Sequence, residues 1–92
     1  MAEIDILLAT YNGERYVAEQ LDSLLRQTWP DFRVLVRDDG SSDSTRDIIK
    51  RYVAAYPDRI TLCEDHGNLG VISNFAELMR LSSAPYVMFS DQ

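Results

Sequence analysis

Short polar segments with unusual side chains interrupt the apolar runs of this sequence. In Thr10-Tyr11-Asn12-Gly13 the tyrosine offers a planar ring that can stack on a nucleobase, beside a hydroxyl and an amide that can orient it. His66-Gly67-Asn68-Leu69-Gly70 has glycines that let a ligand approach the backbone closely. Asp91, within the final Ser90-Asp91-Gln92, is a carboxylate that could bind a divalent cation. These segments are the candidate binding residues.

A further segment, Asp38-Asp39-Gly40-Ser41-Ser42, holds two adjacent carboxylates. Adjacent carboxylates repel each other unless a metal ion, an arginine or several hydrogen-bond donors compensate them, and a pyrimidine N–H or ribose hydroxyls could be such donors. Side chains alternate along a strand, so we expect one of the pair to face a binding region and the other to turn towards solvent or the start of the next helix.

Each segment also has an ordinary structural explanation. Tyr11 could be a partly exposed ring in a turn, and the residues from Asp39 to Asp43 are typical of turns and helix caps. A lone histidine such as His66 is more often structural than a metal ligand, and Asp91 by itself is not a metal site. From the residues alone, both explanations stay open.

Other functional classes are disfavoured. The sequence has no Gly-x-Gly-x-x-Gly after its first apolar run, no phosphate-binding P-loop, no paired Cys and His spacing, and no Gly-x-Ser-x-Gly elbow. Lys plus Arg number 9 against 15 Asp plus Glu, which gives a net charge of −6. This charge argues against binding to a phosphate backbone, so we expect no nucleic-acid partner.

The elements that must position these segments alternate between strands and helices. Periodicity and turn residues predict strands at 4–9, 32–37, 60–63 and 86–89, and helices at 14–28, from a cap within 43–45 to Pro57, and from about Ile72 to Ser82. This βαβαβαβ order favours an α/β fold with a doubly wound, mostly parallel, Rossmann-like sheet. Ligands of such sheets bind beyond the carboxyl ends of the strands, where the polar segments fall.

Composition indicates one cytoplasmic domain. A chain of 92 residues, 46% apolar, suits a single small core. The single cysteine, Cys63, cannot form an internal disulfide, which favours a reducing compartment. No apolar run approaches the ~20 residues of a membrane span, and Glu3 and Asp5 stand where a signal peptide carries bases.

Taken together, the segments resemble the start of a family 2 glycosyltransferase, an enzyme of the GT-A fold that uses a nucleotide sugar. Each matching stretch is weak alone, but together they follow the family's order and spacing across the whole chain. The matching stretches are 8–13, 24–28, 36–43, 68–70 with Asn74, and 89–92.

The resemblance implies a donor pocket and half of a metal site. In it, Tyr11 would lie against a pyrimidine base and Asp39 would accept a hydrogen bond from the base edge or the ribose. Asp91 would be the first acid of an Asp-x-Asp motif that binds Mg²⁺ or Mn²⁺, with the second acid at the position after Gln92. No residue is assigned as a catalytic base. The residues implied to bind the donor are Thr10, Tyr11, Asn12, Asp38, Asp39, Asn68, Gly70 and Asn74.

The resemblance further implies that residues 1–92 are the N-terminal, nucleotide-sugar-binding part of a longer enzyme, inactive alone because the acceptor-binding half is missing. The enzyme would transfer a sugar, with inversion, from a UDP- or dTDP-sugar to a saccharide or lipid-linked acceptor in bacterial cell-surface polysaccharide synthesis. The parent protein would be cytoplasmic or lie at the inner face of the membrane. We also expect the fragment to self-associate through the uncovered end of its last strand.

Alternatives from other classes remain. A nucleotidyltransferase-like domain would also bind a nucleotide and a metal, although Gly13-Glu14-Arg15 is a poor substitute for its glycine-rich basic loop. A receiver-like signalling domain also places acids at strand ends, but no lysine follows the fourth predicted strand here. A binding module without chemistry is the third alternative.

Overall fold

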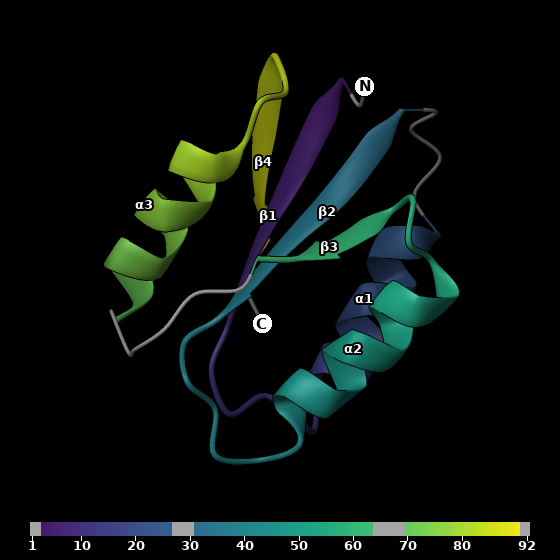
Figure 1. The fold of residues 1–92 in the computed structure, drawn as a ribbon, viewed down its shortest axis with the longest axis vertical. Helices are drawn as coiled ribbons and strands as arrows, with labels where there is room; N and C mark the ends of the chain where they lie inside the picture. The colour runs from purple at the N-terminus through teal and green to yellow at the C-terminus, as the bar shows by residue number, and fades with distance from the viewer. Residues whose placement is uncertain (1–2, 27–30, 64–69, 91–92) are drawn as a thin grey trace.

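The chain alternates strands and helices in the predicted order. The structure is a computed structural model, and it describes residues 3–26, 31–63 and 70–90. Its sheet is four-stranded and entirely parallel, in the order β3-β2-β1-β4, and Figure 1 shows helices on both of its faces. The strands are β1 (Ile4–Thr10), β2 (Phe32–Asp38), β3 (Ile60–Leu62) and β4 (Tyr86–Ser90), and the helices are α1 (Val17–Leu25), α2 (Thr45–Ala55) and α3 (Val71–Leu81).

The two faces of the sheet carry separate apolar cores. Side chains alternate along β1, so Ile6 and Leu8 point to one face while Leu7 points to the other. The first face packs against α1 and α2 through Leu21 and Ile49, and the second packs against Leu78 of α3. This is why the central strands are apolar at successive positions and not only at alternate ones.

The observed elements differ from the predicted ones mainly at their ends. Helix α1 begins at Val17, three residues later than predicted, because the carbonyl of Gly13 accepts the amides of both Tyr16 and Val17 and closes a separate turn. Strand β2 extends through Asp38, the first of the paired acids. The predicted helix end at 27–28 lies outside the described residues.

The acid that interrupts the first strand is fully buried. Asp5 pairs with Arg33 across β1 and β2, at 3.3 Å, and accepts a hydrogen bond of 2.5 Å from the hydroxyl of Ser82, just after α3. Burial alone would raise the pKa of Asp5, but the bonds from Ser82 and Arg33 outweigh it, so this pKa lies below its ordinary value. Asp5 therefore fastens the end of α3 to the sheet.

Strand β4 forms one edge of the sheet and is largely uncovered. Its apolar side chains are exposed, from 36% at Val87 to 63% at Tyr86. Phe89 makes an edge-to-face contact with Phe75 of α3, with ring centres 5.4 Å apart. Within the described residues, no helix is long and apolar enough to cross a membrane.

Candidate functional site

The carboxyl ends of β1 and β2 are joined by the side chain of Asp38. The parallel register places Thr10 beside Asp38, and the Thr10 hydroxyl donates to Asp38 Oδ1 at 2.7 Å. The amide of Ser41 donates to Asp38 Oδ2 at 2.8 Å, and its hydroxyl donates to Oδ1 at 2.5 Å. Both Thr10 and Asp38 are almost completely buried. Asp38 therefore shapes the turn, and the Thr10 hydroxyl proton is engaged inside the protein.

The loop after β1 is tied to the loop after β2. Asn12 has a φ of 48°, in the left-handed region that asparagine tolerates better than most residues. Its amide donates to the Ser41 hydroxyl at 2.7 Å, and its side-chain oxygen accepts the Ser42 amide at 2.8 Å. Asn12, an exposed residue, thus fixes the relative position of the two loops.

The start of α2 is held by a residue one place earlier than its formal cap. Ser44 is the N-cap but its side chain makes no capping bond. Asp43 accepts the Thr45 amide at 3.0 Å and the Glu14 amide at 3.2 Å. Burial would raise the pKa of Asp43, but the Thr45 side-chain bond and these amides lower it below its ordinary value. The predicted cap within 43–45 is confirmed, with Asp43 making the bond.

Asp39 points away from Asp38, and it is fixed on both of its oxygens. Arg37 Nη1 lies 3.1 Å from Asp39 Oδ1, and the amide of Gly70 donates to Oδ2 at 2.9 Å. The same Arg37 nitrogen donates to Asn74 Oδ1 at 3.0 Å, and Asn74 Nδ2 donates to the Arg37 carbonyl at 3.2 Å. We call Arg37, Asp39, Gly70 and Asn74 the Arg37 network.

The paired acids are therefore compensated in two different ways. Hydroxyls and an amide compensate Asp38, whereas a guanidinium compensates Asp39. The expected alternation of the two side chains is confirmed. Of the two directions expected for the second side chain, solvent is wrong, because the exposed fractions are 2% for Asp38 and 4% for Asp39. Asp38 instead turns to Ser41, in the loop that leads to α2.

Most of the predicted site residues meet at this end of the sheet. Tyr11 directly follows β1 and is 48% exposed, so part of its surface is accessible. Gly70 is exposed, with a φ of 85°, and a Cβ built there would meet nothing within 4 Å, so the need for glycine is conformational. Asn74 is buried against Arg37 and does not line an open surface. Asn68 and Asp91 lie outside the described residues, as does His66.

Sequence reasoning missed the importance of Arg37. The sequence patterns place Arg37 at the end of the predicted strand 32–37 and assign it no role, but its side chain is completely buried. A usable signal was present, because residues i and i+2 of a strand share a face and Arg37 and Asp39 carry opposite charges.

The described residues do not by themselves build a metal site. No three acidic, histidine or cysteine residues cluster among residues 3–26, 31–63 and 70–90 in a way that could hold an ion. The proposed metal ligand Asp91 lies outside these ranges.

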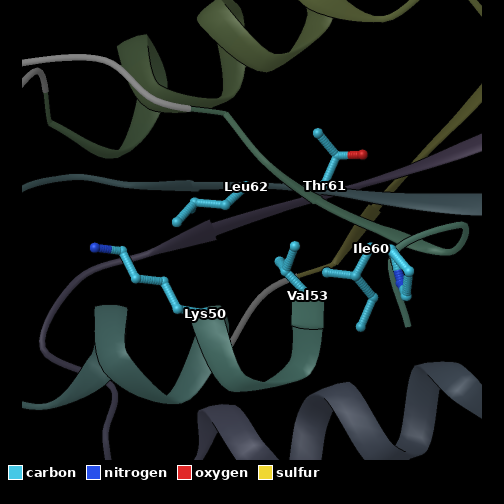
Figure 2. A pocket seen from close by; sticks show the side chains of 6 residues that line it. Lys50, Val53, Ile60, Thr61 and Leu62 are labelled. Atoms are coloured by element: carbon cyan, nitrogen blue, oxygen red, sulfur yellow. The ribbon is translucent and has the colours of Figure 1, made fainter. Parts of the chain in front are cut away.

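A hollow of about 380 Å³ lies elsewhere, between α2 and the edge strand β3 (Figure 2). In Figure 2, Val53 and Lys50 rise from the helix on one side, and Leu62 and Ile60 come from the strand on the other. None of its lining residues is a predicted site residue. They are Lys50, Val53, Pro57, Ile60, Thr61 and Leu62.

The four-stranded parallel α/β sheet has the fold of the GT-A type glycosyltransferases, as solved structures show. The mannosyltransferase PcManGT from Pyrobaculum calidifontis, in complex with GDP-Man and Mn²⁺, superposes with a TM-score of 0.88 at 26% identity, covering 97% of this chain and 27% of that one. Staphylococcus aureus TarS in complex with UDP-GlcNAc gives a TM-score of 0.84 at 28% identity, covering 99% and 26%.

The particular family follows from the sequence comparison. The model of glycosyl transferase family 2 matches residues 5–92, so the chain belongs to this family. The dTDP-rhamnosyl transferase RfbG of Shigella flexneri is 35% identical over 92% of this chain and 31% of its own length. The validoxylamine A glucosyltransferase of Streptomyces hygroscopicus subsp. limoneus is 37% identical over 96% of this chain and 20% of its own length. The chain spans about a third or less of the curated relatives it matches.

Proposed function

We propose that this chain binds the nucleotide of a nucleotide-diphosphate sugar, as the donor-binding part of an enzyme that transfers the sugar to an acceptor hydroxyl. The observation that carries the proposal is the buried Asp39 carboxylate, held on both oxygens at the carboxyl end of β2. Ligands of parallel α/β sheets bind at this end. Family membership and the nucleotide sugars bound by PcManGT and TarS support the same assignment.

The described residues suggest how the nucleotide is held. The Asp39 carboxylate accepts hydrogen bonds only, so it suits an N–H of a base or a ribose hydroxyl. The half-exposed ring of Tyr11 offers a stacking surface for the base. Thr10, Asn12 and Asp38 support the site indirectly. Thr10 bonds to Asp38, and Asp38 and Asn12 bond to Ser41 and Ser42, so that the two loops are held in place.

The finer parts of the proposal rest on the family resemblance. The donor is a UDP- or dTDP-sugar, and the acceptor is a saccharide or a lipid-linked sugar in bacterial cell-surface polysaccharide synthesis. Transfer proceeds with inversion, on the cytoplasmic side of the membrane. A Mg²⁺ or Mn²⁺ ion would stabilise the departing diphosphate, with Asp91 as one ligand. Residues 1–92 supply the donor site and no catalytic base, so the chain alone is inactive.

Titration of the ¹⁵N-labelled chain with UDP and with dTDP, in the presence of Mn²⁺, tests the donor site. We expect amide shifts at Tyr11, Asp39 and Gly70. Replacing Asp39 by Asn should weaken binding by a factor of about 10, since a hydrogen bond to a charged group contributes roughly 1.5–3 kcal/mol. The matched control is Asp47→Asn, an exposed acid on α2.

Two outcomes would contradict the proposal. One is that neither nucleotide shifts the amides at the carboxyl ends of β1 and β2. The other is that Asp39→Asn and Asp47→Asn bind UDP equally well. Glycosyl transfer itself is then measured with the longer protein, by release of UDP or dTDP.

A further inference from the structure

We propose that Arg37 is a positioning residue that determines which nucleobases the site accepts, by holding Asp39 in one orientation and compensating its charge. The inference rests on the proposed function and goes beyond it, because Arg37 acts through Asp39 and not by direct contact with the donor. The observation behind it is an arginine side chain with no exposed surface, inside a parallel sheet. A buried charge is costly unless it is paired and hydrogen-bonded.

The Arg37 network joins two distant parts of the chain at a single atom. Arg37 Nη1 donates to Asp39 Oδ1, just after its own strand β2, and to Asn74 Oδ1 on α3. Asn74 Nδ2 donates back to the Arg37 carbonyl, so the arginine is held at both its backbone and its side chain. Since Gly70 binds the other oxygen of Asp39, the carboxylate plane has little freedom to rotate. The network thus fixes both the position and the direction of the Asp39 lone pairs.

The charge of Arg37 matters as much as its geometry. A guanidinium stays protonated and offers donors only, so its partner Asp39 is favoured as an ionised, acceptor-only group. Such a group accepts the ring N–H of uracil, thymine or guanine. It meets a lone pair in cytosine and adenine, which carry an acceptor nitrogen at the corresponding ring position. The site therefore discriminates against those two bases, because two acceptor lone pairs that face each other repel and form no hydrogen bond.

Without the positive charge, Asp39 would still be almost completely buried. Burial favours the neutral form of a carboxyl group. A neutral Asp39 carries a proton that it can donate to the ring nitrogen of cytosine. Loss of the Arg37 charge should therefore reduce the ratio of UDP affinity to CDP affinity, whereas loss of packing alone should weaken the binding of both nucleotides by the same factor.

The test compares the dissociation constants of UDP and CDP, with Mn²⁺ present, for the wild-type chain and two variants. Arg37→Gln keeps a donor and removes the charge. Arg37→Lys keeps the charge, and one ammonium can replace the guanidinium nitrogen that donates to Asp39 and Asn74. We expect wild type to prefer UDP by about tenfold or more, Arg37→Gln to lose most of this preference, and Arg37→Lys to keep it within about threefold.

Equal loss of UDP and CDP affinity in Arg37→Gln, with the ratio unchanged, would overturn the inference. If Arg37→Gln fails to fold, Asn74→Ala replaces it, because that variant releases the arginine while leaving the ion pair with Asp39 in place. We expect the UDP/CDP ratio of Asn74→Ala to fall about threefold, and an unchanged ratio counts against the inference.

Failure of the proposed function gives a different result. In that case Asp39→Asn binds UDP as well as wild type does, and no variant of Arg37 or Asn74 changes the ratio. If Asp39→Asn weakens UDP binding but the Arg37 variants leave the ratio intact, the donor site stands and only the role of Arg37 is wrong.

Discussion

The bond between Thr10 and Asp38 should be the main side-chain link between the ends of β1 and β2. Its oxygens lie 2.7 Å apart, both residues are almost completely buried, and the acceptor is a carboxylate. Replacing Thr10 by Val removes the hydroxyl and keeps the shape of the side chain. The backbone bond from the Asp39 amide to the Thr10 carbonyl, at 2.8 Å, survives the change.

The expected cost follows from the contacts that remain. A hydrogen bond to a charged group contributes roughly 1.5–3 kcal/mol. Because Ser41 still donates to Asp38 through its amide and its hydroxyl, the carboxylate is not left unsatisfied, and the lower end of that range applies. We therefore expect Thr10→Val to reduce the free energy of unfolding by about 1.5–2 kcal/mol. With a urea slope of about 1 kcal/mol/M, the midpoint should fall by about 1.5–2 M.

Urea unfolding followed by circular dichroism measures this loss. Thr61→Val is the matched control, because Thr61 is half-buried in the edge strand β3 and its replacement should change stability by less than about 0.5 kcal/mol. In the background of Asp38→Asn, Thr10→Val should cost about 1 kcal/mol less than in wild type, since the acceptor is then neutral. A loss below about 0.5 kcal/mol, or full additivity of the two changes, would refute this account of Asp38.

Further predictions concern positions outside this bond. Gly70→Ala should destabilise the fold by about 1 kcal/mol, as measured in urea, because a φ of 85° strains alanine even where space is open; an unchanged midpoint contradicts this. The hydroxyl of Tyr52 donates to Asp22, which together with burial raises the pKa of Tyr52 from 10.0 to about 12. Because the pKa of Tyr52 is higher in the folded state, wild type should exceed Tyr52→Phe in free energy of unfolding by its full margin below pH 10, and this margin should shrink towards pH 12. Unfolding curves recorded over a pH series measure the margin, and a margin that stays constant contradicts the prediction. The exposed β4 should cause self-association that rises with concentration in sedimentation velocity and is weaker in Met88→Lys. Equally strong association of the variant and wild type would contradict this role of β4.

The order of the elements could be predicted because each has a strong local pattern. Alternation along β2 correctly placed Asp38 and Asp39 on opposite sides, and turn residues located the loops. The start of α1 was misplaced because Gly13 closes a turn whose hydrogen bonds do not show in hydrophobic periodicity.

The Arg37 network could not be predicted in the same way. Its bonds join residues separated by 31 and 37 positions, from Gly70 to Asp39 and from Arg37 to Asn74. Only the pairing of strands and the packing of α3 bring these residues together. Local sequence patterns describe the strand that carries Arg37, but they say nothing about the helix that covers it. The roles of Asn68 and Asp91 stay predictions.

The position of β1 also has a consequence for synthesis on the ribosome. β1 is made before the other three described strands, yet it lies inside the sheet, between β2 and β4, and β4 ends only at Ser90. Until that last strand leaves the exit tunnel, one whole edge of an apolar strand stays open to other nascent chains. We expect chaperones that shield strand edges to bind the nascent chain in the interval between the synthesis of β1 and the emergence of β4.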